Sequence, residues 1–335
     1  MPVLGQGLVP SGALANELTA VTRRAFVPKL IVQLYNSTPF LAALIANAKM
    51  ASGGVSSVSV PIQGQPFVTP QWTDYSGAFA QPAAQQGAFL SEFNLKLSVV
   101  PIPFLGTEGL VQMDHSIIPL IEARMNDASN SQCDLFATAL YNNTTNLNAF
   151  IGLPGAIDDG TNMVTYGNLS RNTNTYWKSK VYNAGSVNPT RQNVLQYIAG
   201  VVKSGAELPT FGLMGLGTWT LLAQDFVGQE SYVITPDKAF DELSDGPRSA
   251  FRALMVGGIP IFGDPYCPEG LLYLPNSNYI SLYLHEAASF AFSGFESTLS
   301  NFQLGYVGVL LTLGELVSVK PKTMARVGSY NSIAI

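Results

Sequence analysis

Two runs of sequence decide the fold, and both follow the longest helical pattern of the chain. Residues 151–158 read Ile-Gly-Leu-Pro-Gly-Ala-Ile-Asp, and residues 166–177 read Tyr-Gly-Asn-Leu-Ser-Arg-Asn-Thr-Asn-Thr-Tyr-Trp. Their distinctive members are a Gly-Leu start, a Tyr-Gly pair, one arginine and a final aromatic pair: Gly152, Leu153, Tyr166, Gly167, Arg171, Tyr176 and Trp177. Residues of these types indicate close packing and form no catalytic motif.

The helical pattern occupies residues 109–143. Apolar residues recur there at three-and-four spacing and form one stripe: Leu110, Met113, Ile117, Ile121, Met125, Ala128, Leu135, Phe136, Ala139 and Leu140. Pro119 suits an early helical position, with Ser116 as the N-cap. A helix of about 25 residues would be ~37 Å long. We expect it to span the molecule and to bury Phe136 against a sheet.

The residues before this helix predict a two-stranded extension. Apolar and polar residues alternate at 58–62 and again at 93–99, which is typical of half-buried strands. The connection between them, residues 63–88, is rich in Gln, Gly, Pro and Ala and carries four spaced aromatic residues: Phe67, Trp72, Tyr75 and Phe79. Connections of that length are normally functional or disordered. We expect a projecting loop whose aromatic residues contact a neighbouring chain.

The rest of the chain predicts an α+β fold. A second helix is expected from Asn188-Pro189 to Val202, with the cap and the first-turn proline in the right order. Short apolar strands alternate with Gly/Pro turns over 208–280, residues 302–319 are rich in strand formers, and Pro321 begins the tail. A long helix with interspersed antiparallel strands belongs to the α+β class.

The composition indicates assembly. Only 12% of the 335 residues are charged, about half the usual fraction, whereas 47% are hydrophobic. No stretch reaches the roughly 18 apolar residues of a membrane helix. Soluble monomers rarely expose large apolar patches, so we expect much of the surface to be buried against other chains.

Charge and cysteine content exclude several classes. A net charge of −5 argues against a surface that binds nucleic acid tightly, and the one basic cluster, at residues 23–29, suits a solvated helix face. Cys133 and Cys267 form no disulfide framework and are expected to be reduced. Residues 1–22 show no secretion signal, which fits synthesis in the cytoplasm.

No catalytic or metal-binding constellation emerges. His115 and His285 each stand beside a carboxylate, but a metal or general-base role needs further converging ligands. Residues 215–220 lack the third glycine and the lysine of a phosphate-binding loop and indicate a tight strand-to-helix turn. The acidic stretch 237–245 lacks calcium-loop spacing. We expect no enzyme, cofactor or metal.

The runs at 151–158 and 166–177 resemble a segment that follows the long helix in many major capsid proteins of tailed bacteriophages. Asn168 stands where that family usually has a second glycine. Residues 258–265, 270–274 and 280–282 also resemble later strands of the family, and the order of elements agrees over nearly the whole chain.

The resemblance implies the Hong Kong 97-like capsid fold. By that resemblance, residues 1–50 form an N-terminal arm and 51–108 the extended E-loop. Residues 109–189 form a peripheral domain with a long spine helix, and 190–299 an axial domain. Residues 300–335 form return strands of the peripheral domain and a C-terminal tail.

The function implied is structural. Copies of the chain would form pentamers and hexamers of an icosahedral or prolate head that encloses double-stranded DNA without sequence-specific binding. The resemblance implies a virion protein that assembles in the bacterial cytoplasm, with a separate scaffolding protein, a portal and a decoration protein as partners and no membrane.

Two departures and two alternatives accompany the resemblance. No acidic, coiled-coil-like prefix precedes Met1, so an internal scaffolding segment is not evident. Residues 51–95 contain no Lys or Arg, so the lysine cross-link of some family members has no donor in the loop.

A shell of the same fold that holds protein cargo, like an encapsulin, is the first alternative. A metal-dependent enzyme that uses His115 or His285 is a remote one.

Overall fold

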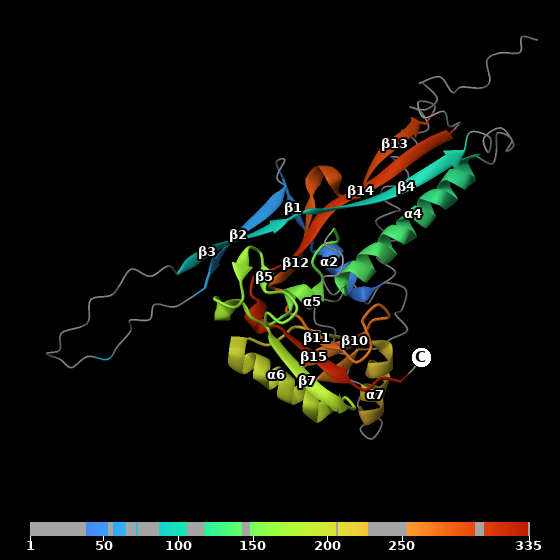
Figure 1. Ribbon diagram of the computed structural model, residues 1–335. Coiled ribbons are helices and arrows are strands. Elements are labelled where there is room, and N and C mark those ends of the chain that lie inside the picture. Colours follow the sequence, from blue (N-terminus) through green and yellow to red (C-terminus); the bar gives the residue numbers. More distant parts are fainter. Residues whose placement is uncertain are drawn as a thin grey trace, which may run out of the picture.

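The computed structural model, drawn in Figure 1, describes residues 38–52, 56–64, 72, 87–105, 117–142, 148–205, 207–226, 253–298 and 305–333. The predictions for most of the N-terminal arm, for the tip of the loop and for the acidic stretch 237–245 lie outside these residues. In the described part of the chain, no helix is long and apolar enough to cross a membrane.

A five-stranded sheet is built around one long strand, β14 (Gly305–Ser318). The antiparallel strand β4 (Lys96–Leu105) pairs with β14 over ten positions. On its other side β14 pairs with β13 (Ala291–Ser297) and β12 (Ile280–His285), and β12 also pairs with the parallel strand β1 (Lys49–Ala51).

A six-stranded mixed sheet forms the second centre of the molecule. Its order is β7 (Lys180–Val187), β15 (Ala325–Tyr330), β11 (Leu272–Leu274), β8 (Gly212–Met214), β10 (Ile259–Gly263) and β9 (Leu254–Val256). Helices α6 (Arg191–Gly205) and α7 (Leu216–Phe226) pack against it, and Val194, Ile198 and Val201 of α6 share its core.

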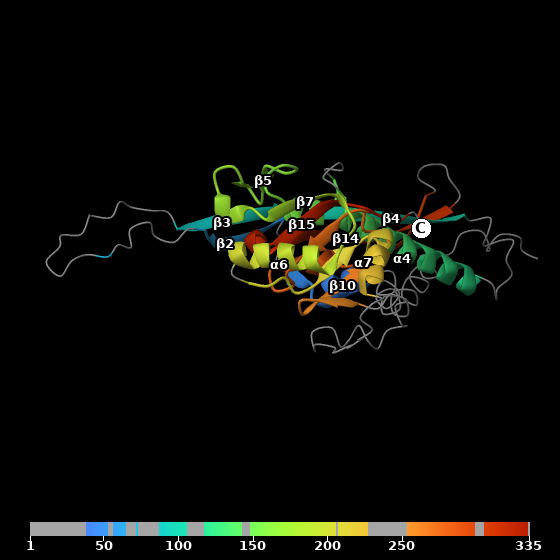
Figure 2. The same cartoon turned by 90° about the horizontal axis from the view of Figure 1, so that it is seen from below.

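The long helix α4 (Ile117–Leu140) has 24 residues and runs beside β4, so the predicted helix is confirmed (Figure 1). Met125 and Ala128 pack against Ile102 of β4 in one core cluster. Phe136 is buried in another, with ring centroids 5.5 Å from Phe150. The short helix α2 (Pro39–Ala46) joins this second cluster, and the described molecule is elongated and flat (Figure 2).

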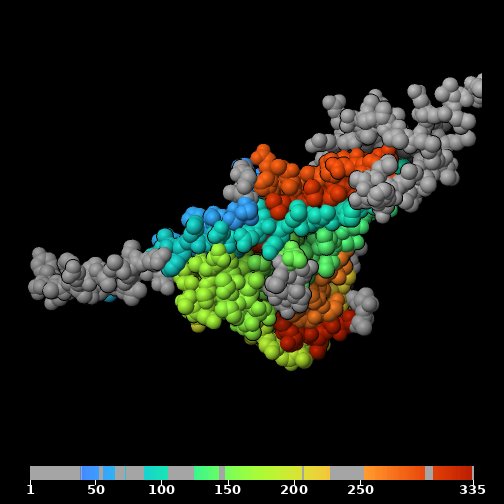
Figure 3. Space-filling model, turned by 45° about the horizontal axis from the view of Figure 1, so that its top comes forward, coloured from blue at the N-terminus to red at the C-terminus, as the bar shows by residue number. Residues whose placement is uncertain are grey.

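Two strands form a ribbon that projects from the body. β2 (Ser57–Gln63) and β3 (Ala88–Asn94) pair antiparallel over seven positions, from Ser57–Asn94 to Gln63–Ala88. Figure 3 shows the blue surface of β2 beside the cyan surface of β3 and β4, which runs as a strip along the molecule. The sequence predicted one strand through residues 93–99, but the chain breaks between β3 and β4 at Leu95, which is buried.

Short elements complete the described chain. They are α5 (Leu153–Ala156), β5 (Thr165–Tyr166), β6 (Leu169–Ser170) and three short 3₁₀ helices: η1 (Thr175–Trp177), η3 (Glu286–Ala288) and η5 (Pro321–Thr323). Most of them surround the base of the ribbon, between the two sheets (Figure 1).

The two sheets draw their strands from across the segment boundaries that the sequence predicted at residues 189, 299 and 321. Strand β7 lies in the six-stranded sheet instead of beside the long helix, and β12 and β13 lie in the five-stranded sheet. Strand β15, expected as a tail, pairs with β7 and β11 inside the six-stranded sheet. The reason is that these pairings join residues far apart in sequence, which local patterns do not reveal.

Two local predictions need correction. Helix α6 begins at Arg191, and the Thr190 hydroxyl, rather than Asn188, accepts the N–H of Asn193 at 3.3 Å. Leu135, expected in the buried stripe of α4, is 48% exposed because it lies at the edge of that stripe beside an open groove.

Candidate assembly site at the base of the ribbon

Arg171 lies at the centre of the residues that the sequence singled out, and its side chain is fully buried. Its guanidinium donates hydrogen bonds to three backbone carbonyls, those of Ala156 (2.9 Å), Met163 (3.1 Å) and Trp177 (3.3 Å). Burial lowers the pKa of Arg171 because the charged form loses its hydration, but a guanidinium remains protonated in proteins. One side chain therefore joins three separate backbone positions.

Asp158 supplies the opposite charge. One of its carboxylate oxygens lies 3.7 Å from Arg171, and the other lies 3.5 Å from Arg326 of β15. The first oxygen also accepts three backbone N–H groups at 2.9–3.0 Å, from Gly160, Asn162 and Met163. A buried ion pair needs such additional hydrogen bonds to offset its desolvation. The contact between Asp158 and Arg326 ties residues 151–177 to the six-stranded sheet.

Tyr166 and Trp177 tie the same run to the five-stranded sheet. The Trp177 indole N–H donates to the Tyr166 carbonyl at 2.9 Å, and both side chains are buried. The Tyr166 hydroxyl accepts the N–H of Ser318 at 2.9 Å and donates to the Leu316 carbonyl at 3.4 Å, both on β14. Desolvation raises the pKa of Tyr166, so the hydroxyl keeps its proton for this contact.

The Tyr-Gly pair forms a tight hairpin turn. Gly167 and Asn168 join β5 to β6 and have φ values of 57° and 60°. Two consecutive left-handed residues are the signature of a type I′ turn, in which glycine and asparagine are favoured. Asparagine adopts this left-handed conformation more readily than most other residues that carry a side chain, so Asn168 suits the position.

The turn rests against strand β3 of the ribbon. A Cβ on Gly167 would lie 2.6 Å from the Phe93 ring, so only glycine permits this approach. The Glu92 N–H donates to the Gly167 carbonyl at 3.1 Å, and the Asn168 amide donates to the Glu92 carboxylate at 3.2 Å. The Phe93 and Tyr166 rings meet edge to face at 5.0 Å.

Tyr176 packs on the end of the ribbon where Gln63 pairs with Ala88, away from Phe93. Its ring lies over Gly64, where a Cβ would overlap the ring atoms. Its centroid is also 5.5 Å from that of Phe89 on β3. The ribbon is therefore held by two aromatic contacts, at Phe93 and at Phe89, which restrict its direction relative to the body.

Gly152 and Leu153 connect the same region to the end of the long helix. A Cβ on Gly152 would lie 2.5 Å from the Ala139 carbonyl and 2.6 Å from the Leu140 carbonyl. Leu153 is fully buried in the cluster that contains Phe136. The start of the run therefore packs directly on the last turn of α4.

Five of the seven motif residues lie together at the base of the ribbon, namely Tyr166, Gly167, Arg171, Tyr176 and Trp177. Gly152 and Leu153 pack instead on the last turn of α4. Of the four aromatic residues expected to contact a neighbouring chain, Phe67, Tyr75 and Phe79 lie outside the described residues, and Trp72 is fully exposed. Sequence reasoning assigned no role to Asp158, Glu92, Phe93 or Arg326. Asp158 ends the run 151–158, and the alternation at residues 93–99 indicates that Phe93 faces inward. The sequence therefore contained a signal for these two residues.

The remaining sequence candidates have structural roles where they are described. His115 lies outside the described residues, and the His285 Nδ1 atom accepts the Ala287 N–H at 3.2 Å. No group of three potential metal ligands occurs in the described part of the chain. The predicted strand-to-helix turn at 215–220 is confirmed between β8 and α7, where the Glu269 carboxylate accepts the N–H groups of Gly217 and Thr218 at 2.9 and 3.0 Å.

Solved structures share this fold over most of the chain. A chain of the capsid asymmetric unit of cyanophage A-1(L) aligns with a TM-score of 0.62 at 15% identity, covering 88% of this chain and 93% of that one. A chain from Microbacterium phage Oxtober96 gives 0.54 at 14% identity, with 87% and 91% covered.

An encapsulin shares the fold as well. The holo-SrpI encapsulin complex from Synechococcus elongatus PCC 7942 gives a TM-score of 0.53 at 12% identity, with 94% of this chain and 98% of that one covered. No family model and no curated protein sequence matches the chain. The structural alignments show that the chain has the mixed α+β fold of Hong Kong 97-like capsid and shell proteins.

Proposed function

We propose that this chain is the major capsid protein of a tailed bacteriophage, a structural protein without enzymatic activity. The carrying observation is its likeness in fold to the cyanophage A-1(L) capsid chain over 88% of its length. The ribbon adds support, because its base is fixed to the body while Trp72 beyond it is fully exposed. In this function, copies of the chain form the pentamers and hexamers of a closed head.

The parts of the fold suit the roles that we assign to them. Residues 1–50 serve as the N-terminal arm, and the ribbon with its connection, within 51–108, serves as the E-loop. Helix α4 is the spine of a peripheral domain centred on the five-stranded sheet. The six-stranded sheet with α6 and α7 is the axial domain, which contacts its counterparts at the centre of each pentamer or hexamer.

We assign the contents and partners of the head from the likeness in fold to phage capsid chains, and the charge bears on how DNA is contacted. A chain with a net charge of −5 offers few partners for phosphate groups, so it encloses double-stranded DNA without sequence-specific contacts. We assign it to the virion, assembled in the bacterial cytoplasm. A separate scaffolding protein, a portal and a decoration protein complete the proposed set of partners.

The second candidate is a nanocompartment shell of the same fold. The specific observation in its favour is the alignment with the SrpI encapsulin, which covers 98% of that chain. Because capsid and encapsulin folds are alike, the contents of the particle, rather than its shape, distinguish the two functions.

Electron microscopy of the expressed full-length chain tests the proposal. We expect closed shells, and a chain that remains monomeric at high concentration in dilute buffer contradicts any shell function. Nuclease protection, for nucleic acid, and mass spectrometry, for protein, of particles purified from the native source then separate the candidates. Nuclease-protected double-stranded DNA supports a phage head, whereas a co-purifying cargo protein bound inside supports an encapsulin.

A further inference from the structure

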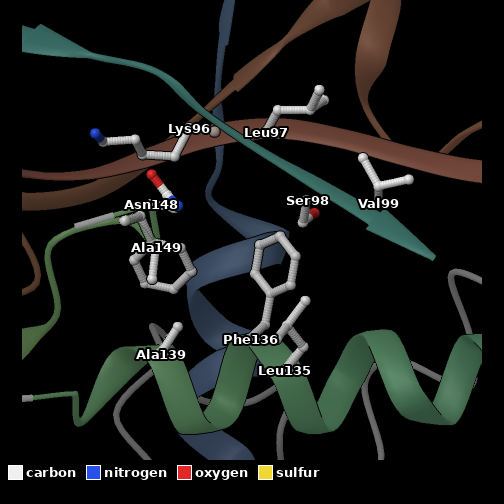
Figure 4. A pocket seen from close by; sticks show the side chains of 11 residues that line it. Lys96, Leu97, Ser98, Val99, Leu135, Phe136, Ala139, Asn148 and Ala149 are labelled. Carbon is white, nitrogen blue, oxygen red and sulfur yellow. The ribbon is translucent and has the colours of Figure 1, made fainter. Parts of the chain in front are cut away.

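A groove separates the first half of β4 from the last turns of α4. It is lined by Lys96, Leu97 and Val99 of β4, by Leu135 and Phe136 of α4 and by Phe150, and its volume is about 200 Å³. Figure 4 shows Leu135 and Phe136 rising from α4 towards β4, with Asn148 and Ala149 at one end.

The groove exposes apolar side chains. Leu97, Val99 and Leu135 are 56%, 46% and 48% exposed, although they lie close together around it. Single exposed apolar residues are common on soluble proteins, but several that gather around one hollow mark an interaction site. No described residue of the chain covers them.

We propose that this groove receives Trp72 from a second copy of the chain. The inference rests on the proposed shell function and adds to it the acceptor site of the contact. Trp72 is fully exposed, so it does not occupy the groove of its own chain. Aromatic anchors that enter a pocket on the partner are the side chains that contribute most to interfaces.

The size of the groove suits a single large side chain. An apolar cavity of roughly 150 Å³ accommodates one benzene ring, so about 200 Å³ suits an indole. Pockets for small molecules and cofactors usually measure roughly 300–1,000 Å³. A tryptophan from a protein partner therefore fits this groove better than a free ligand does.

The charges of the two sides are complementary. Asp74 is the one charged residue of the connection 63–88 and lies two positions after Trp72. Lys96 is the one charged residue that lines the groove. Because Asp74 follows Trp72 by only two positions in the sequence, the opposite charge of Lys96 favours the correct orientation of a docked Trp72 more than it adds to affinity.

The edge of the sheet beside the groove suits an extended partner. β4 pairs with β14 on one side, and no described strand pairs with its other side. Pro101 and Pro103 lack N–H groups and hinder strand addition to the second half of β4. An extended segment can therefore lie along the first half, which is the half that lines the groove.

The geometry of the ribbon explains why the partner is a second copy. The contacts of Phe93 and Phe89 with Tyr166 and Tyr176 hold the ribbon against the body. In Figures 1 and 2 the open end of the ribbon and α4 lie towards opposite ends of the molecule. A neighbouring copy placed beyond the ribbon can present its groove to Trp72.

A photo-crosslinker at Leu135 identifies the occupant. We would replace Leu135 with p-benzoylphenylalanine in the full-length chain, assemble a mixture of ¹⁴N- and ¹⁵N-labelled subunits, irradiate the shells and digest them with trypsin. Because residues 50–95 contain no Lys or Arg, Trp72 stays in one peptide, residues 50–96. We expect this peptide to be crosslinked to the α4 peptide in mixed-isotope pairs.

Other crosslinks overturn the proposal. Pairs of one isotope only mean that the groove is filled by its own chain. A crosslink to residues 1–37 means that the N-terminal arm is the occupant. If shells form without any crosslink from position 135, the groove is empty and the shell function still stands, whereas a wild-type chain that never associates contradicts both.

A double-mutant cycle provides the second measurement. Trp72→Ala and Leu135→Asp should each weaken subunit association about 30-fold, as expected for a major anchor. The double variant should be no weaker than either single variant, because both remove the same contact. Leu208→Asp is the matched control, since Leu208 is 54% exposed and does not line the groove. Additive losses, or an equal loss from Leu208→Asp, overturn the proposal.

Discussion

The base of the ribbon and the groove beside α4 differ in how completely one chain supplies the packing partners of their side chains. At the ribbon base, buried charges and rings find their partners within the same chain, as the contacts of Arg171 show. At the groove, Leu97, Val99 and Leu135 remain half exposed. This fold therefore completes the attachment of its ribbon within one chain and leaves the groove beside α4 for another copy.

Deleting the connection of the ribbon should produce the largest effect on assembly. Removing residues 65–86 and bridging the gap with glycines leaves β2, β3 and their contacts with the body intact. We expect a folded chain, by circular dichroism and thermal unfolding, that forms no closed shells in electron micrographs. Normal shells from this variant would mean that the connection is dispensable for assembly.

Breaking the ribbon base should instead destabilise the fold. Arg171→Met removes three hydrogen bonds to carbonyl groups and leaves Asp158 without its buried partner. Removing one partner of a buried pair costs about 3–5 kcal/mol, which denaturant unfolding of the unassembled chain can measure. Lys203→Met is the control at an exposed position of α6 and should change stability by less than about 0.5 kcal/mol. Equal effects of the two variants would contradict a structural role for Arg171.

Phe136 and Leu135 test the boundary between the core and the groove. Phe136→Ala should lower the free energy of unfolding by about 3–5 kcal/mol, because the ring is buried beside Phe150 and Phe290. Leu135→Ala, one residue earlier, should cost less than about 1 kcal/mol, because this side chain is half exposed. If the unassembled chain loses as much stability from Leu135→Ala, the groove is closed within one chain.

Glu315 makes stability depend on pH. This β14 residue is buried, and one carboxylate oxygen accepts the Ile151 N–H at 2.7 Å, while desolvation raises its pKa to about 8. A folded-state pKa above the unfolded value of 4.5 means that the folded chain retains a proton that the unfolded chain loses. Stability should therefore fall by up to about 1.4 kcal/mol per pH unit as the pH rises from about 5 towards 8.

The Glu315→Gln variant checks this dependence. Glutamine does not titrate, so thermal unfolding of the variant should vary less with pH between about 5 and 8 than that of the wild type. A wild-type profile that is already flat over this range, or an equally steep one in the variant, would rule out Glu315 as the cause.

The smallest expected effect is an absence of covalent links between copies. Residues 51–95 hold no lysine, and both cysteines are buried and take part in no disulfide within the described residues. Boiling assembled particles in detergent and reductant should therefore release single chains on a gel. A ladder of multimers would show that copies are joined by another chemistry.

Local patterns predicted much of the fold. The period-two alternation at residues 58–62 predicted β2, and the apolar stripe with Pro119 predicted α4. The turn at Gly215 was predicted because residues 215–220 contain closely spaced glycines but lack the third glycine and the lysine of a phosphate-binding loop. In each case the signal lies within a few residues of the element that it predicts.

Long-range pairing escaped the same reasoning. Strand β15 pairs in parallel with β7, about 145 residues earlier, and nothing near Pro321 indicates that the chain re-enters a sheet. The ribbon base was recognised as a set of packing residues, but the approach of Phe93 to Gly167 depends on two separate segments. Leu135 was misassigned because the helical period alone does not indicate where the covering sheet ends.

The way in which the ribbon is mounted has a mechanical consequence. Its strands of seven residues are roughly 24 Å long, and they are held against the body near both ends, by Phe93 on Tyr166 and by Phe89 on Tyr176. A sideways force on the ribbon is therefore carried by two separated contacts and acts as a torque on the body. Tyr166 passes this torque to β14 and Asp158 passes it to β15, so a neighbour that pulls on the ribbon loads both sheets at once.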